Sequence, residues 1–283
     1  MYLPEGAFAP VPTPLNESGA FDHAALAAHL KWLKAEGLAG ALILGTNGEF
    51  ASCSLGERRL IAEAAAKADS GLKLLLNVGS CALPEALDMA DIGAGLGFDA
   101  LLCPPPWYFR QAPVAGLADF FKRLLDASKL PVLLYHIPQM TGVPISDELL
   151  DAIGPHEGLV GVKDSTGDET EMARLMPRVA AYLVGHDKLV ATCMAAGGKG
   201  SISACASVVP DLVASIMHKP DQQGKLNSVR GLLEKFGLGA SVKAVLRRKG
   251  FGAYAARPPL TGMDPGSEKQ LIVMLDMFGA IRW

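Results

Sequence analysis

Along about the first 220 residues, short apolar runs typical of β-strands alternate with helical patterns, and this alternation constrains the fold more than any other feature. A repeated strand–helix unit builds a parallel sheet with helical crossovers. Eight such units predict a (β/α)8 barrel, with a doubly wound open sheet as the alternative, because periodicity does not separate the two. The expected strands are residues 7–11, 40–45, 73–79, 99–104, 131–138, 159–164, 181–185 and 200–206.

The helical segments carry their own signals. Residues 22–36 repeat leucines on one face, and Ser54 with Glu57 three residues later predicts a capping box at a helix start. From about residue 222 onward the pattern is mostly helical. The chain has 283 residues, half of them hydrophobic, which suffices for a large barrel core. We therefore expect a (β/α)8 barrel domain over residues 1–222 and a C-terminal helical domain over 223–283.

Charge and cysteine usage exclude several classes of protein. The net charge of −3 offers no basic patch for nucleic acid, so no nucleic-acid partner is expected. The N-terminus lacks the pattern of a signal peptide, and no apolar run reaches transmembrane length, so no membrane partner is expected. Five scattered cysteines without a CxxC pair indicate reduced thiols, which predicts a cytoplasmic protein without a zinc site.

Lys163 is the sharpest chemical candidate. It ends the apolar run "LVGVKD", although lysine is among the residues least often buried. The carboxyl ends of barrel strands carry the active site. Burial disfavours the charged amine, and a neutral amine attacks ketones to form a Schiff base, which acts as an electron sink. The alternatives are that Lys163 extends its amine into solvent or pairs with Asp164.

Two further strand ends carry polar groups. Tyr135 ends the run "LLYHIP", and its hydroxyl could transfer protons if another donor or acceptor held it; otherwise it packs in the core or at the rim. "GTNGE" (45–49) is a glycine-flanked turn. Its backbone N–H groups, with the Thr46 hydroxyl, could hold a carboxylate, although most such turns are only turns.

Other motifs near the carboxyl ends of the expected strands do not indicate a nucleotide or metal site. "GGKGS" (197–201) lacks the Gly-Lys-Ser/Thr order of a phosphate loop, which argues against a nucleotide site. His136 and His186 fall at strand ends without a convergent third ligand, so a metal site is not expected. Either histidine could contact substrate hydroxyls or satisfy a local hydrogen bond.

Three motifs, in this order and at these spacings, resemble the dihydrodipicolinate synthase/N-acetylneuraminate lyase family: "GTNGE", "YHIP…TG" and "GVKDSTGD". The resemblance covers essentially the whole chain, including "SVKAVLRRKGF…RPPL" in the helical tail. It implies a (β/α)8 barrel with a C-terminal helical domain, assembled as a homodimer or homotetramer. It also implies Schiff-base chemistry on pyruvate or another 2-oxo acid.

The resemblance assigns catalytic roles to four positions. Lys163 matches the Schiff-base lysine, and Tyr135 matches the tyrosine that protonates and deprotonates the reacting atoms. Thr46 matches the threonine that links this tyrosine to a second tyrosine, which reaches across from a dimer mate in many members. Tyr108 in "PPPWYF" is the best match to that second tyrosine, and Trp107 is the alternative because the segment to Tyr135 is one residue longer than usual.

The resemblance also implies substrate contacts. Backbone N–H groups of Thr46 and Asn47 would hold the pyruvate carboxylate, and Gly185 and Ile202 would line the pocket. Asp187 and Ser203 match positions that contact the sugar chain in the lyases. His136 and Gln139 could add further polar contacts.

Two differences from the motifs of the synthases narrow the choice of substrate. The synthases carry an arginine that clamps the carboxylate of aspartate semialdehyde, and Met140 stands at that position. A thioether cannot replace a bidentate guanidinium, so Met140 disfavours dihydrodipicolinate synthase activity. Asn47 replaces a second threonine of the synthases. The motifs look more like those of aldolases and dehydratases acting on 2-keto-3-deoxy sugar acids or 4-hydroxy-2-oxoglutarate.

The leading hypothesis is a class I aldolase that cleaves a 2-keto-3-deoxy sugar acid, or a related 4-hydroxy-2-oxo acid, to pyruvate and an aldehyde. No metal or organic cofactor is expected, because the Schiff base on Lys163 supplies the electron sink. The alternatives are a dehydratase or hydratase using the same iminium, a dihydrodipicolinate synthase, and a barrel that binds 2-oxo acids without turnover. A metal-dependent aldolase would need clustered ligands at the strand ends.

Overall fold

Eight parallel strands close into a barrel in the computed structural model, which describes residues 2–279 and 281. The strands follow chain order around the barrel, and β1 pairs with β8 to complete it, which confirms the barrel and rules out the open sheet. The predicted run 200–206 is a shorter strand than expected, because residues 204–207 form a 3-10 helix. The strands are β1 Gly6–Pro10, β2 Gly40–Ile43, β3 Lys73–Asn77, β4 Ala100–Cys103, β5 Val132–His136, β6 Leu159–Asp164, β7 Ala181–Val184 and β8 Gly200–Ile202.

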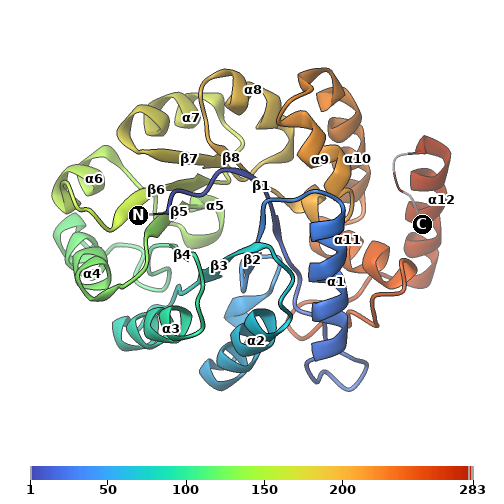
Figure 1. The fold of residues 1–283 in the computed structure, drawn as a ribbon, viewed down its shortest axis with the longest axis horizontal. Helices are drawn as coiled ribbons and strands as arrows, with labels where there is room; N and C mark the ends of the chain where they lie inside the picture. The colour runs from blue at the N-terminus through green and yellow to red at the C-terminus, as the bar shows by residue number, and fades with distance from the viewer. Residues whose placement is uncertain (1, 280, 282–283) are drawn as a thin grey trace.

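Helices surround the strands, as Figure 1 shows. Ser54 and Glu57 form the predicted capping box, in which each side chain bonds the other residue's backbone N–H. The α-helices up to the end of the barrel are α1 His23–Ala35, α2 Leu55–Lys67, α3 Leu83–Gly95, α4 Val114–Ala127, α5 Pro138–Thr141, α6 Asp147–Ile153, α7 Glu169–Leu175, α8 Val190–Ala195 and α9 Pro210–Ile216. Short 3-10 helices are η1 Phe50–Ser52, η2 Met176–Arg178, η3 Asp187–Leu189, η4 Ala204–Ser207 and η5 Pro220–Gln222.

Three helices follow the barrel, as the sequence pattern predicts: α10 Gln223–Lys235, α11 Leu238–Arg248 and α12 Pro265–Phe278. They lie together at one side of the barrel, next to α9 (Figure 1). The division into domains at residues 222 and 223 stays a prediction, and part of its second domain lies outside the described residues. None of the helices in the described part of the chain combines the length and apolar composition needed to cross a bilayer.

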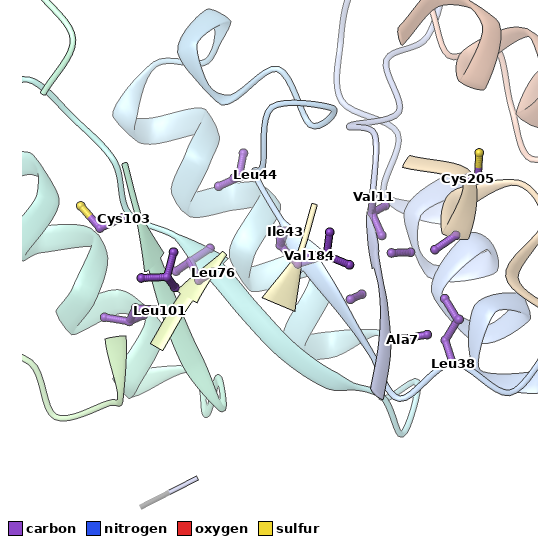
Figure 2. Packing of buried hydrophobic residues seen from close by; sticks show 14 of the residues in the cluster. Ala7, Val11, Leu38, Ile43, Leu44, Leu76, Leu101, Cys103, Val184 and Cys205 are labelled. Carbon is purple, nitrogen blue, oxygen red and sulfur yellow. The ribbon is translucent and has the colours of Figure 1, made fainter. Parts of the chain in front are cut away.

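The alternation of side chains along each strand creates two apolar cores. Leu42 points into the barrel, where it packs with Phe8 and Leu133, whereas the next residue, Ile43, points out toward the helices. Figure 2 shows part of the outer core, to which Ile43 and Leu76 belong. The same alternation turns Tyr135 inward, because it belongs to the inner core. The barrel interior is therefore packed with apolar side chains, and Tyr135 belongs to that inner core near the carboxyl end of β5.

His29 and Tyr254 join α1 to the segment after α11. The Nε2–H group of His29 donates to the carbonyl of Ser207 at 3.0 Å, and its Nδ1 atom accepts from the Tyr254 hydroxyl at 3.1 Å. These partners suit the neutral ring. Burial is the main reason that the pKa of His29 falls from 6.5 to about 4. The charged ring is therefore disfavoured in the folded protein.

We expect acid to unfold the protein partly through His29. Because its pKa is depressed on folding, the unfolded chain binds more protons between pH 6.5 and 4. The stabilisation is therefore complete above pH 6.5 and is lost as the pH falls toward 4, by up to about 3 kcal/mol. Urea unfolding should show a weaker dependence on pH in His29→Gln than in the wild type. The same substitution at exposed His218 is the control, and parallel pH curves for wild type and His29→Gln would refute the prediction.

Candidate active site

A cavity of about 320 Å³ opens at the carboxyl ends of the strands, where barrel enzymes hold their active sites. A larger hollow of about 680 Å³ lies near the first residues of β6 and β7, at the opposite end. The smaller cavity brings together most of the residues that the sequence singled out. Those lining it are Thr46, Asn47, Tyr135, Gln139, Met140, Lys163, Gly185 and Ile202.

Lys163 is buried at the end of β6, with 3% of its surface exposed. Its Nζ atom lies 4.1 Å from the centre of the Tyr135 ring, the residue paired with it on β5. Burial argues against a lysine that extends into solvent. Asp164 instead accepts from the Tyr182 hydroxyl at 2.7 Å and from Thr166 at 2.8 Å, so its carboxylate is already occupied. The arrangement presents an amine inside the cavity.

The Tyr135 hydroxyl sits between two other hydroxyl groups. It lies 3.2 Å from Thr46 Oγ1 and 3.4 Å from Ser165 Oγ, which donates to it. Burial raises the pKa of Tyr135, but the charge of Lys163 and hydrogen bonds from Ser165, Thr46 and Lys163 outweigh it, so the pKa lies below its usual value. A phenol with a lowered pKa is suited to take up and return a proton.

Gly185 closes the cavity beside this pair. Its N–H group donates to the carbonyl of Asp164 at 2.5 Å, which holds the end of β7 against the end of β6. A Cβ atom at this position would collide with Ser165 Oγ and crowd the Asp164 carbonyl. Only glycine therefore allows the end of β7 to approach Ser165 and the Asp164 carbonyl so closely.

Gly185→Ala should displace Ser165 and the end of β6. Because a shift of about 1 Å in a reacting group costs about 10²-fold in rate, we expect a loss of that order in the rate of Schiff-base formation. Borohydride trapping with pyruvate over time measures this rate. Gly56→Ala, on α2 where nothing lies within 4 Å of the new Cβ, is the control. Equal trapping rates in both variants would contradict the role of Gly185.

The structure does not bring His136 or Ser203 to the cavity. His136 follows Tyr135 and Ser203 follows Ile202, and both Tyr135 and Ile202 point into the barrel. Because successive side chains along a strand point to opposite faces, His136 and Ser203 point outward. The His136 ring accepts from the N–H of Ile145 at 3.0 Å and reaches Glu171 at 2.9 Å outside the barrel. Neither side chain is placed to contact a molecule in this cavity.

Asp187 is also turned away from the cavity. It is fully buried in η3, where one carboxylate oxygen accepts from the N–H of Cys205 at 3.1 Å. The other oxygen accepts from Arg230 Nη1 at 2.6 Å. Asp187 therefore holds Arg230, and it is Arg230 that lines the cavity.

The candidates for the second tyrosine lie on the loop after β4. Tyr108 is 77% exposed and packs edge-on against exposed Phe109, away from the cavity of its own chain. Trp107 is half-buried and packs edge-on against Phe50. Within the described part of one chain, the Thr46 hydroxyl bonds Tyr135, and neither Trp107 nor Tyr108 forms a hydrogen bond to it.

Sequence analysis missed three polar residues that line the cavity: Glu49, Ser165 and Arg230. His186, which it named as a possible contact for substrate hydroxyls, also lines the cavity. Ser165 follows Lys163 at a two-residue spacing, which could have signalled that it shares the same face. Glu49 forms a buried ion pair with Lys243 of α11. Arg230 comes from α10, and no local pattern connects it to the barrel. Within residues 2–279 and 281, His, Cys, Asp and Glu side chains do not gather in groups of three or more as metal ligands would.

The fold and the site define a class of protein: a (β/α)8 barrel that holds a buried lysine against a hydrogen-bonded tyrosine in its carboxyl-end cavity. A model of the Dihydrodipicolinate synthetase family matches residues 3–277, and the chain belongs to this family. The protein is thus a lyase of the class I, pyruvate-dependent kind that works through a Schiff base.

Individual relatives agree with this assignment. The chain is 33% identical over 261 residues to an uncharacterized DapA-like lyase of Chloroflexus aurantiacus, covering 87% of each chain. It is 31% identical over 216 residues to a 4-hydroxy-tetrahydrodipicolinate synthase of Natronomonas pharaonis, covering 75% of this chain and 73% of the relative. The crystal structure of dihydrodipicolinate synthase from Aquifex aeolicus matches with a TM-score of 0.91 and 26% identity, over 98% of this chain and 99% of that one.

Proposed function

We propose that the protein is a class I aldolase that cleaves a 2-keto-3-deoxy sugar acid, or a related 4-hydroxy-2-oxo acid, to pyruvate and an aldehyde. One observation carries the proposal: the buried Lys163 amine lies against Tyr135, whose hydroxyl is held by Thr46 and Ser165. A protein that only bound 2-oxo acids would need neither the buried amine nor the prepared phenol.

The proposed reaction begins with attack of the Lys163 amine on the C2 carbonyl, followed by loss of water to give an iminium. Tyr135 takes the proton of the C4 hydroxyl, the C3–C4 bond breaks, and the aldehyde leaves. The electron pair of that bond passes to the iminium, which becomes an enamine. Tyr135 returns its proton to C3 of the enamine, and water then hydrolyses the resulting iminium to release pyruvate and free Lys163.

The end of the cavity near "GTNGE" suits the carboxylate at C1. The Nδ2 atom of Asn47 is buried and finds no hydrogen-bond partner in the described part of the chain. A buried donor without a partner is costly, and a substrate oxygen would satisfy it. We assign the backbone N–H groups of Thr46 and Asn47, with this amide, to the substrate carboxylate.

We assign the second tyrosine to Tyr108 of another copy of the chain. An aromatic residue with 77% of its surface exposed, beside exposed Phe109, supports an interface there. In a homodimer or homotetramer, this tyrosine would reach Thr46 of the neighbouring copy and extend its hydrogen-bond chain to Tyr135.

Met140 bears on the choice among family activities. It lines the mouth of the cavity and is 63% exposed, where an arginine would clamp a second carboxylate. A thioether offers no such clamp, which supports an aldolase over a dihydrodipicolinate synthase. A dehydratase would use the same iminium but release water instead of an aldehyde.

The test is to incubate the protein with pyruvate, reduce with borohydride, and map the adduct by mass spectrometry. We expect a reduced pyruvate adduct on Lys163. Its absence would refute the Schiff-base proposal. Product analysis with a 2-keto-3-deoxy sugar acid then separates the aldolase, which yields pyruvate and an aldehyde, from the dehydratase, which yields neither.

A further inference from the structure

Arg230 gives the catalytic cavity a second cationic side chain. Among the described residues that line the cavity, Lys163 and Arg230 carry the cationic groups. Arg230 lies on α10, outside the barrel, and is 8% exposed. A nearly buried guanidinium at the cavity wall is placed to contact the part of a substrate that extends beyond Lys163.

The charge of Arg230 is already compensated. Its Nη1 atom donates to Asp187 at 2.6 Å, and its Nε atom donates to Glu234 at 2.9 Å. Lys188 also pairs with Glu234 at 3.2 Å, but the Lys188 side chain is 48% exposed. One guanidinium therefore faces two carboxylates. An additional anion from the substrate would gain little attraction from Arg230, because both carboxylates repel it.

Hydrogen-bonding capacity nevertheless remains in Arg230. Its Nη2 group donates to no acceptor among the described residues. Such a group bonds a hydroxyl oxygen without needing a negative charge on its partner. The pairing with two carboxylates fixes the guanidinium, so little side-chain freedom is lost when a substrate binds.

Two neighbours in the cavity wall supply uncharged groups. The Nδ1 atom of His186 accepts from the N–H of Lys188 at 3.4 Å, which leaves the proton on Nε2, and Nε2 lies 3.9 Å from Glu234, beyond hydrogen-bonding distance. Burial lowers the pKa of His186, which favours this neutral ring. The Gln139 amide donates to the carbonyl of Ser165 at 2.8 Å, which leaves its oxygen as an acceptor. Together the wall offers both donors and an acceptor, which is the pattern that hydroxyl groups match.

We propose that Arg230, fixed by Asp187 and Glu234, is a specificity-determining residue that binds hydroxyl groups on an uncharged substrate tail. Its compensated charge selects 2-keto-3-deoxy sugar acids over 4-hydroxy-2-oxoglutarate, whose tail is a carboxylate. The inference rests on the proposed aldolase function and decides between the two substrate classes that it contains.

The test compares kcat/KM for a 2-keto-3-deoxy hexonate and for 4-hydroxy-2-oxoglutarate. We expect the wild type to prefer the hexonate by about tenfold or more. Glu234→Gln removes one compensating charge from a partly exposed residue and keeps its shape. It should raise kcat/KM for the dicarboxylate about tenfold and change that for the hexonate much less. Arg230→Lys, which loses the Nη2 donor, should lower kcat/KM for the hexonate about tenfold.

Glu63→Gln is the matched control. Glu63 pairs with Arg59 at 3.0 Å with the same four-residue spacing on α2, away from the cavity, so its substitution should leave the substrate ratio unchanged. A wild type that prefers the dicarboxylate, that cleaves neither substrate, or whose ratio does not move in Glu234→Gln would overturn the inference. Borohydride trapping with pyruvate, which has no tail, tests the proposed function separately. If every variant forms the adduct but the ratio of kcat/KM for the two substrates does not change, only the role of Arg230 is refuted. If the wild type forms no adduct, the proposed aldolase function is refuted.

Discussion

Lys163→Ala should lower kcat by about 10⁴-fold or more, the scale on which loss of a covalent nucleophile acts. The amine is the group that would convert the C2 carbonyl into an electron sink. Without it, the electron pair of the breaking C3–C4 bond has no cationic group to receive it. Pyruvate release, followed with a coupled dehydrogenase, measures the loss. The pyruvate adduct formed under borohydride should vanish in the same variant.

Two other substitutions separate chemistry from packing. Lys163 is buried against the Tyr135 ring, so alanine also leaves a hole. Lys163→Met keeps the length of the side chain without the amine, and Lys163→Arg keeps the charge without the nucleophile. All three should be equally inactive. Lys129→Met, at an exposed lysine paired with Asp91, should retain full activity and a full adduct. Residual turnover in Lys163→Met above about 1% of wild type would contradict the proposed mechanism.

The barrel could be predicted from the sequence because each strand is a local signal. The run "LVGVKD" is apolar over the span that forms β6, and the strand–helix alternation repeats eight times. The ends of the strands were harder to predict from the sequence, because residues 204–207 are as apolar as a strand but form η4. Hydrophobic pattern alone does not record where backbone hydrogen bonding stops.

The candidate site could be predicted only in part. Lys163 and Tyr135 lie on the paired strands β6 and β5, and Thr46 follows β2 across the barrel, so closing the barrel brings all three to one cavity. His136 was expected beside the substrate, although the period of two that turns Tyr135 inward also turns its neighbour outward. The pairing of Asp187 with Arg230 joins η3 to a helix beyond the barrel, 43 residues away. No periodicity connects such distant residues, because their contact depends on how α10 packs.

Tyr135→Phe should lower kcat by about 10²- to 10⁴-fold, the range for loss of a positioned acid–base group. The ring that packs over the Lys163 amine is kept, so the cavity keeps its shape. What disappears is the hydroxyl between Thr46 and Ser165. The pyruvate adduct should therefore still form, with an affinity for pyruvate within about threefold of wild type. Equal losses in pyruvate affinity and in kcat would count against a proton-transfer role.

Thr46→Val tests the cause of the lowered Tyr135 pKa without touching the phenol. Burial alone raises this pKa, and the charge of Lys163 with the hydrogen bonds from Ser165, Thr46 and Lys163 brings it down. The iminium keeps a positive charge at Lys163 during the reaction, so that contribution persists. Removing the Thr46 hydroxyl should raise the pKa of Tyr135. The rising limb of the kcat–pH profile should then move to higher pH, with a loss in kcat at neutral pH of about tenfold. An unmoved limb would mean that the titration observed in kcat belongs to another group.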